Sequence, residues 1–340
     1  MAEISRKDRA VGAIMGTLIG DALGLGCHWY YDLDAMRADY GDWISDYTEQ
    51  KPGRTDRFGY IAKHRHELGM KAGDVSQTGA LIVMLMESVA ECGGYDENDY
   101  TTRFDTFLKT LDGTDLSGGF TDRAERHLWE NRKNDVPWGE AGSLTDTSEA
   151  AQRAVVFAAL CGDDYEAMAK QAYSNIKLTH ADRYIAGYSL SFALSTGALI
   201  NGTPLDNIQS EVKKFAQNPA IEPMLSSWDI NQQIYNGFPG ADPTITIDPM
   251  DACKLFGLNC TLGFMAPAAY FLIYRFPDNF EKAVLNSINA GGNQMARAAL
   301  TGGLSGAMVG IQGIPERFIT GLNDHERLLG LAEKIADGKS

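Results

Sequence analysis

The residues of this chain that could do chemistry lie in or beside predicted helices. Asp21 lies inside the apolar stretch "GTLIGDALG", Asp74 lies in "KAGDVSQTG", and His180 follows Thr179 in "LTHADRYIAGYS". Carboxylates and an imidazole can supply general acid–base catalysis, so Asp21, Asp74 and His180 are the candidate catalytic residues. Each has a structural alternative, because a buried aspartate can cap a neighbouring helix or loop and a lone histidine can be a hydrogen-bonded core residue.

Polar and aromatic residues near these candidates form a predicted ligand site. A helix N-terminus is a natural anion site, glycines let the backbone approach a ligand, and side-chain amides offer neutral donors and acceptors. The aromatic run can stack on a planar ligand or belong to the core, and one residue of the polar turn must be a helix N-cap. The candidate ligand-binding residues are His28, Trp29, Tyr30, Ser76, Gln77, Thr78, Gly291, Gly292, Asn293 and Arg297.

Helices must position these residues, because apolar side chains recur with a helical period along nearly all of the chain. Val11, Ile14 and Leu18 mark one face of a first helix, and Leu81 and Leu85 mark a helix that follows the polar turn "GDVSQTG". Further helices are predicted near 163–176, 181–200, 205–217, 260–275, 279–289, 294–310 and 324–337.

A helix start is also predicted in the stretch "DTSEAAQRAVVFAAL". Asp146 and Glu149 have the spacing of a capping box, in which each side chain accepts a hydrogen bond from an otherwise unpaired backbone amide of the first turn. The prediction gives both acids a structural role.

The pattern of elements predicts the fold class. Strand-like alternation is hard to find, no internal repeat occurs at a fixed period, and no linker divides the helices into two self-sufficient sets. Two stretches rich in Pro, Gly and Asp, near 46–73 and 237–250, are predicted surface loops. We therefore predict one all-α domain over residues 1–340, an orthogonal helical bundle.

The composition of the chain limits the classes of partner that it can bind. The chain has 340 residues, 44% of them hydrophobic, and a formal net charge of −15. Such an acidic chain is a poor match for nucleic acid or an anionic membrane, which leaves a small molecule as the expected ligand. The longest apolar run, "CTLGFMAPAAYFLIY", is interrupted by Pro267 and is shorter than the roughly 20 residues of a spanning helix. We expect a buried core helix there.

Cysteine usage bears on the compartment. The five cysteines are widely spaced, no pair has the spacing of a zinc finger, and the start "MAEISRKDRAV" looks like a charged helix lead-in rather than an export signal. The prediction is a soluble protein of the cytoplasm, with unknown oligomeric state.

The order of these motifs resembles the ADP-ribosylglycohydrolase family. "GTLIGDALG", the polar turn, "TH" before a long helix, and "NAGGN" before "GGLSGAMVGIQGIPERF" carry the resemblance over essentially the whole chain. "HWYYD" is similar to the branch that includes the J-type crystallins. The resemblance implies an all-α orthogonal bundle and a central cleft in which two magnesium ions position ADP-ribose for cleavage at its anomeric carbon.

The resemblance also implies where magnesium ligands would lie. Active members have Thr-Asp-Asp-Thr in the first polar turn and Gly-Gly-Asp-x-Asp in the late turn. Here the first turn is "VSQT", residues 75–78, and the late turn is "GGNQMA", residues 291–296. The aligned metal positions are Ser76, Gln77, Asn293 and Met295. Magnesium prefers carboxylate oxygens and a thioether is a poor substitute, so no cofactor is expected.

Several functions remain open from the sequence. The chain can be a metal-independent hydrolase of a ribosyl or related glycosidic bond, a binder of a nucleotide or ADP-ribose-like ligand without turnover, or a structural protein of the crystallin kind. Arg297 can supply positive charge to a bound anion in place of magnesium, or form an ion pair with Asp74 or Asp21.

Overall fold

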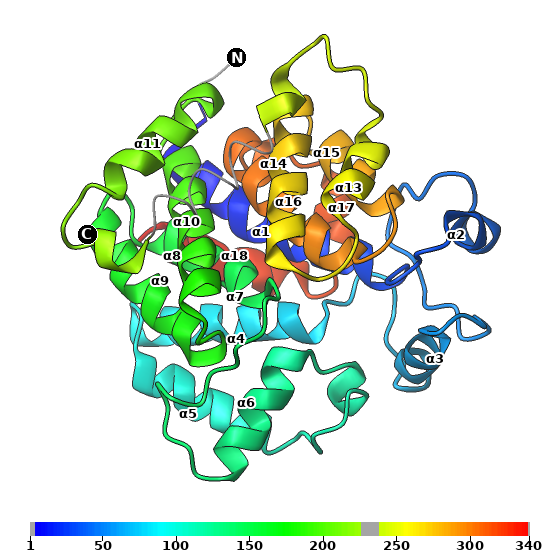
Figure 1. The fold of residues 1–340 in the computed structure, drawn as a ribbon, viewed down its shortest axis with the longest axis horizontal. Helices are drawn as coiled ribbons and strands as arrows, with labels where there is room; N and C mark the ends of the chain where they lie inside the picture. The colour runs from blue at the N-terminus through cyan, green and yellow to red at the C-terminus, as the bar shows by residue number, and fades with distance from the viewer. Residues whose placement is uncertain (1–3, 226–237, 339–340) are drawn as a thin grey trace.

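The computed structural model describes residues 4–225 and 238–338, and helices make up its regular structure (Figure 1). The helices are α1 (Arg6–Leu25), α2 (Leu33–Tyr40), α3 (Gly59–Glu67), α4 (Gln77–Cys92), α5 (Glu97–Leu108), α6 (Arg123–Lys133), α7 (Glu149–Arg153), α8 (Val155–Leu160), α9 (Tyr165–Thr179), α10 (Arg183–Ile200), α11 (Ile208–Phe215), α13 (Pro249–Phe256), α14 (Leu262–Arg275), α15 (Phe280–Asn289), α16 (Gln294–Val309), α17 (Glu316–Gly321) and α18 (His325–Ala336). Within those two described ranges there is no β-strand, and two isolated bridges join Ser143 to His180 and Thr147 to Thr261. The predicted all-α single-domain fold is confirmed.

The centre of the fold is the contact between α1 and α16, which is the most extensive between any two helices described. α1, in blue, runs through the middle of the molecule in Figure 1. The two helices are antiparallel, and four small residues of α1 face α16 in the pairs Gly12–Gly306, Gly16–Gly302, Gly20–Ala298 and Gly24–Met295. A Cβ on Gly16 would lie closer than 3.0 Å to the Gly302 carbonyl oxygen, so the glycine spacing allows the two backbones to touch.

The strongly periodic segments form helices where the sequence predicts them, from α1 and α4 through α9 and α10 to α14, α15, α16 and α18. Helices that the sequence reading did not predict include α2, α3, α5, α6, α13 and α17. α6 shows why: most of its residues are charged, so its buried stripe is narrow. α3 lies inside the stretch 46–73, and α13 begins at the end of the stretch 237–250, of which residue 237 lies outside the described residues.

The predicted capping box of Asp146 and Glu149 is wrong. α7 begins at Glu149 after Ser148, and no side chain caps it. Asp146 Oδ2 instead accepts a hydrogen bond from Thr261 Oγ1 at 3.0 Å, and Glu149 Oε2 lies 3.1 Å from His180 Nε2. Partners from distant parts of the chain bind both carboxylates, which a local rule does not detect.

α14 contains all but the first two residues of the long apolar run, and its residues 265–274 are buried, including Pro267. Among the helices of the described ranges, none combines the length and the apolar character needed to cross a membrane.

Candidate functional site

Asp21 lies on α1 and is fully buried. Its carboxylate accepts two hydrogen bonds from Ser76, one from the backbone N–H at 2.7 Å and one from Oγ at 2.6 Å. Ser76 is the N-cap of α4, where its Oγ also accepts a bond from Gly79 N. Burial raises the pKa of Asp21 to about 6, although the Ser76 bonds oppose the shift. Asp21 thus fixes the start of α4 against α1.

The rest of the first polar turn points toward α6. Gln77 Nε2 donates to Thr121 Oγ1 at 3.1 Å, and Thr78 Oγ1 donates to Asp122 Oδ2 at 3.3 Å. Asp122 precedes α6 as its N-cap residue, and its side chain makes no cap hydrogen bond. The carboxylate is therefore free to face the first polar turn.

Three carboxylates, Asp122, Glu125 and Glu149, form what we call the acid cluster. Asp122 is half-buried, whereas Glu125 and Glu149 are 1% and 4% exposed. They lie at the starts of α6 and α7, close enough to interact electrostatically. The charge of Glu149 raises the pKa of Asp122, and the charges of Glu149 and Asp122 raise the pKa of Glu125. Buried like charges cannot all remain ionised in one place, so members of the cluster must retain protons.

The protons of the acid cluster are unevenly distributed. Burial, followed by the negative charge of Glu149, raises the pKa of Asp122 to about 8. The same two causes raise the pKa of Glu125 well above its usual value, and neither carboxylate oxygen of Glu125 has a hydrogen-bond partner in the described structure. Burial acts on Glu149 too, but hydrogen bonds from His180 and Thr147 outweigh it and lower its pKa. These shifts favour the ionised form of Glu149 and the protonated forms of Asp122 and Glu125.

His180 follows α9 as its C-cap residue and is fully buried. Its Nε2 lies 3.1 Å from Glu149 Oε2 and 3.1 Å from Thr147 Oγ1, and its Nδ1 lies 2.9 Å from Thr179 Oγ1. The predicted helix start nearby belongs to Asp182, which caps α10 through Ile185 N. His180 is thus the one predicted catalytic residue that contacts the acid cluster by a hydrogen bond.

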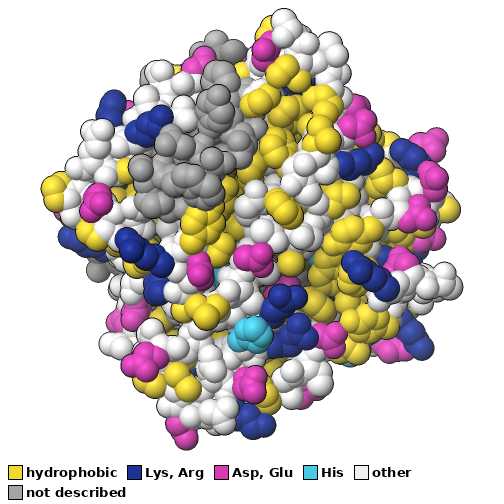
Figure 2. Space-filling view, viewed as in Figure 1, with side chains coloured by type: hydrophobic (Ala, Val, Ile, Leu, Met, Phe, Trp, Pro, Cys, Tyr) yellow, Lys and Arg dark blue, Asp and Glu magenta, His cyan; other side chains and the backbone are white. Residues whose placement is uncertain are grey.

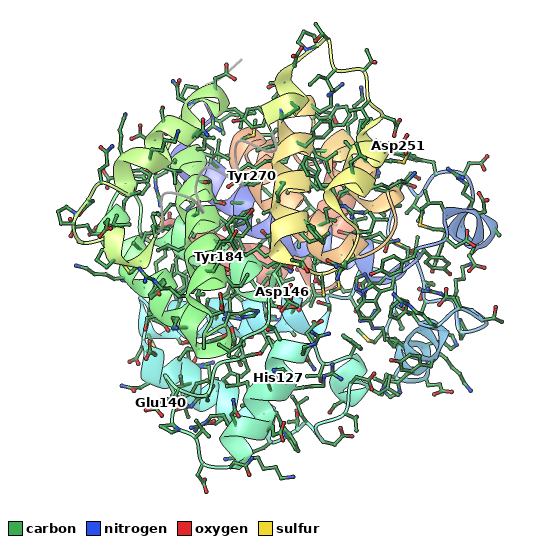
Figure 3. All side chains as sticks on the ribbon, in the orientation of Figure 1. His127, Glu140, Asp146, Tyr184, Asp251 and Tyr270 are labelled. Carbon is green, nitrogen blue, oxygen red and sulfur yellow. The ribbon has the colours of Figure 1, made fainter. Side chains whose placement is uncertain are left out.

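Cys260 and the exposed Asp146 lie near the acid cluster. Burial raises the pKa of the Cys260 thiol to about 12, with further contributions from the charges of Glu149, Asp122 and Asp146. Asp146 is exposed, and Figure 3 labels it near the middle of the molecule together with His127 of α6. Figure 2, in the same orientation, shows acidic, basic and histidine side chains side by side there.

Asp74 lies apart from the acid cluster. Its carboxylate accepts bonds from Lys71 N at 2.7 Å and from Asn323 Nδ2 at 2.7 Å, and it lines a surface hollow between α4 and α18. The side chains of Asp74 and Ser76 therefore point in different directions, Asp74 toward Asn323 and Ser76 toward Asp21.

Another hollow, of about 400 Å³, is lined by Leu108 and Trp129 of α5 and α6 and does not include the acid cluster.

The aromatic run packs against the late turn. Trp29 N donates to both Gly292 O at 3.2 Å and Gln294 Oε1 at 3.0 Å, and Gly292 N donates to Tyr30 O at 2.7 Å. His28, Trp29 and Tyr30 are 3%, 8% and 1% exposed, so these predicted ligand-binding residues are buried in the protein. The ring centroids of Trp29 and Phe120 lie 4.5 Å apart, and the two rings are packed edge to face.

The late turn is filled by protein contacts. Gly291 and Gly292 have φ values of +78° and +72°, and a Cβ on them would meet Leu33 and Leu258. Asn293 Oδ1 accepts from Ala296 N at 3.2 Å as the N-cap of α16. The glycines are thus needed for the turn and for close packing, in addition to any role toward a ligand.

Arg297 is fully buried and binds backbone carbonyls. Its Nη2 donates to Ser287 O at 2.5 Å and Gly291 O at 2.6 Å, and its Nε donates to Ser287 O at 3.2 Å. Neither Asp21 nor Asp74, both in the described part of the chain, is among its hydrogen-bond or ion-pair partners. The ion pair proposed from the sequence is absent, because the guanidinium turns back onto the α15–α16 turn.

None of the acid cluster is among the catalytic residues predicted from the sequence. One signal was available, since Glu125 lies three residues before the buried Leu128 and beside the buried Ala124 in "TDRAERHL". An acid on the apolar stripe of a helix is the same feature that singles out Asp21. For Glu149, the local capping pattern concealed the tertiary role.

The four residues at the magnesium positions expected from the resemblance have other surroundings. Ser76 binds Asp21, Gln77 binds Thr121, and Asn293 caps α16, while Met295 supplies only a thioether. Among the residues that the structure describes, no three His, Cys, Asp or Glu side chains are arranged to hold a metal ion.

Comparisons with known proteins relate the whole chain to one family. The family model described as ADP-ribosylglycohydrolase matches residues 2–340. A protein of Archaeoglobus fulgidus, described as uncharacterized, is 23% identical over 331 residues, which cover 97% of this chain and 96% of that protein. A solved structure described as an ADP-ribosylglycohydrolase-related protein complex has a TM-score of 0.63 at 17% identity, with 98% of each chain covered. This last similarity shows the fold.

Proposed function

This chain belongs to the ADP-ribosylglycohydrolase family, and from that premise we propose that it hydrolyses the glycosidic bond of a ribosyl or ADP-ribose-like ligand by carboxylate chemistry. Asp122 is the general acid, and Glu149 is the general base or nucleophile. Asp21 and Asp74 do not take part in the chemistry in this proposal.

The proposal rests on two carboxylates of the acid cluster that have different surroundings. Glu149 Oε2 lies 3.1 Å from His180 Nε2, whereas Asp122 Oδ2 accepts from Thr78 Oγ1 at 3.3 Å, and the pKa values of the two acids shift in opposite directions. Asp122, with a pKa raised to about 8, holds a proton that it can deliver to the leaving group. Glu149, with a lowered pKa, is ionised and can activate water or attack the anomeric carbon. Glycoside hydrolysis uses this division between a protonated and an ionised carboxyl group.

The proposal includes a mechanism without the two magnesium ions of active relatives. A two-magnesium site needs several carboxylate oxygens, and the aligned positions are occupied by a hydroxyl, two amides and a thioether. The oxygen of Ser76 and that of Asn293 are already used in helix caps. These residues do not fit magnesium, so no step is assigned to a metal.

The test measures release of ADP-ribose from an ADP-ribosylated peptide, with EDTA and with added magnesium. Asp122→Asn and Glu149→Gln should each lower kcat by at least about 100-fold, which is the usual contribution of a positioned acid or base. Asp278→Asn, at an exposed position, is the control and should leave the rate unchanged. Full activity in Asp122→Asn, or loss of activity in EDTA with recovery in magnesium, would overturn the mechanism.

Calorimetry with ADP-ribose separates the alternatives. Binding without turnover in the parent protein would favour a ligand-binding protein, and neither binding nor turnover would favour a structural, crystallin-like role. Binding that survives in Asp122→Asn while turnover is lost is the result we expect.

A further inference from the structure

We propose that Thr179 is a positioning residue that holds His180 in the neutral tautomer with its hydrogen on Nε2, so that the imidazole donates to Glu149. This inference rests on the proposed function of Glu149 and deepens it. In this arrangement His180 never takes the proton of the reaction, and it acts by keeping Glu149 oriented and ionised.

The first step is the donor on the far side of Thr179. Arg153 is buried, and its Nη2 donates to Thr179 Oγ1 at 2.8 Å. The guanidinium is itself fixed, because its Nε donates to Asn175 Oδ1 at 2.7 Å. A guanidinium has no acceptor, so Thr179 Oγ1 must accept in this contact.

The second step is the direction of the Thr179 hydroxyl hydrogen. Two acceptors lie near Oγ1: His180 Nδ1 at 2.9 Å and Ile176 O at 3.4 Å. The shorter distance lies within the usual range for such a bond and the longer one outside it. The hydroxyl therefore donates to Nδ1, which must be the unprotonated nitrogen of the ring.

The third step follows from the ring chemistry. A neutral imidazole with a bare Nδ1 has its hydrogen on Nε2, which faces Glu149 Oε2 at 3.1 Å. A hydrogen bond donated to a carboxylate favours the ionised form, so the Nε2 hydrogen stabilises the negative charge of Glu149. Arg153, Thr179, His180 and Glu149 thus form a continuous chain of directed hydrogen bonds.

Hydrogen bonds to Ser143 fix the backbone of the two residues that flank His180. Ser143 N donates to Thr179 O at 2.8 Å, and Ala181 N donates to Ser143 O at 2.7 Å. These bonds fix the backbone from which the imidazole of His180 extends. The tautomer therefore depends on the groups that the ring faces, which are Thr179 at Nδ1 and Glu149 with Thr147 at Nε2.

The experiment reads the tautomer by ¹⁵N NMR on the ¹⁵N-histidine-labelled full chain, with His180 assigned by its loss in His180→Gln. We expect one protonated nitrogen at Nε2 and one bare nitrogen at Nδ1 in the parent protein. Thr179→Ser, which keeps the hydroxyl, should retain this pattern. Thr179→Val removes the donor to Nδ1 and should shift the population toward the Nδ1–H tautomer or a mixture.

The outcomes are independent of turnover. An Nδ1–H or doubly protonated His180 in the parent protein would overturn the proposal, even if Thr179→Val fails to fold. An unchanged His180 pattern in a folded Thr179→Val would do the same, with the His127 signals as the internal check of folding. If the tautomer is as expected and no substrate is hydrolysed, the proposed function fails while the positioning by Thr179 stands.

Discussion

Gln294 holds the backbone of Trp29 at the end of α1. Its Oε1 accepts from Trp29 N at 3.0 Å, while its Nε2 donates to Cys27 O at 2.8 Å. Trp29 has φ of +64°, a conformation that is rare for a bulky residue, so the bond secures a strained position. The late turn, which the sequence suggested as a ligand site, thereby joins α16 to the aromatic run.

The first prediction concerns this amide. Gln294→Glu replaces the Nε2 group that donates to Cys27 O with a carboxylate oxygen. Two buried acceptors, this oxygen and the Cys27 carbonyl, would then face each other. The variant should lose about 1–3 kcal/mol of unfolding free energy in urea denaturation at pH 7. Gln217→Glu, at an exposed position, is the matched control and should change it by less than about 0.5 kcal/mol. Equal stability of the two variants would contradict the assigned role of Gln294.

The second prediction concerns the contact between α1 and α16. Gly16→Ala puts a methyl group against the Gly302 carbonyl and should destabilise the protein by at least about 1–3 kcal/mol, the usual cost of overpacking. Gly330→Ala, in α18 with nothing near its Cβ, should instead stabilise by about 0.5–1 kcal/mol through helix propensity. Thermal melts of both variants check the prediction, and opposite shifts in Tm are expected.

The third prediction concerns Glu125. Its pKa is raised in the folded protein, so the unfolded chain releases this proton at a lower pH than the folded chain does. Above the usual glutamate pKa of about 4.3, the parent protein should therefore lose stability relative to Glu125→Gln, by up to about 1.4 kcal/mol per pH unit. Urea denaturation at pH 4 and pH 8 should show a difference that grows with pH. A constant difference would mean that Glu125 titrates normally.

The fourth prediction concerns Arg297. Arg297→Met leaves the Ser287 and Gly291 carbonyls without their side-chain donor and should cost about 1–3 kcal/mol. Because no carboxylate of residues 4–225 and 238–338 pairs with Arg297, the loss should be the same at pH 4 and pH 7. An ion pair with Asp21 or Asp74 would instead make the loss shrink at acidic pH, and denaturation at the two pH values distinguishes these cases.

The fifth prediction concerns the rate of the proposed hydrolysis. The pH profile of kcat/KM should be bell-shaped, falling above about pH 8 as Asp122 loses its proton and falling below the usual glutamate pKa of about 4.3 as Glu149 gains one. Asp122→Asn should remove the alkaline limb from the residual activity. A profile that stays flat up to pH 10 would exclude Asp122 as the acid.

The sequence by itself determined the strongly periodic helices and their order. A periodic apolar stripe in α1, α4 or α16 is a local property, because side chains three and four residues apart share a face whatever lies opposite. The glycines of α1 and α16 recur at the same spacing, and the order of motifs was enough to indicate the family. These features need no knowledge of distant contacts.

Only the tertiary structure decided which polar residues meet. Asp74 and Ser76 are two residues apart, yet the turn sends one to Asn323 and the other to Asp21. Glu149 has the local spacing of a helix cap, but His180, 31 positions along the chain, binds its carboxylate instead. A hydrogen bond or a pKa shift depends on what lies within a few ångströms in space, and helices from distant parts of the chain supply those neighbours. The acid cluster exists because α6, α7 and the end of α9 converge, and a single segment of sequence does not contain that information.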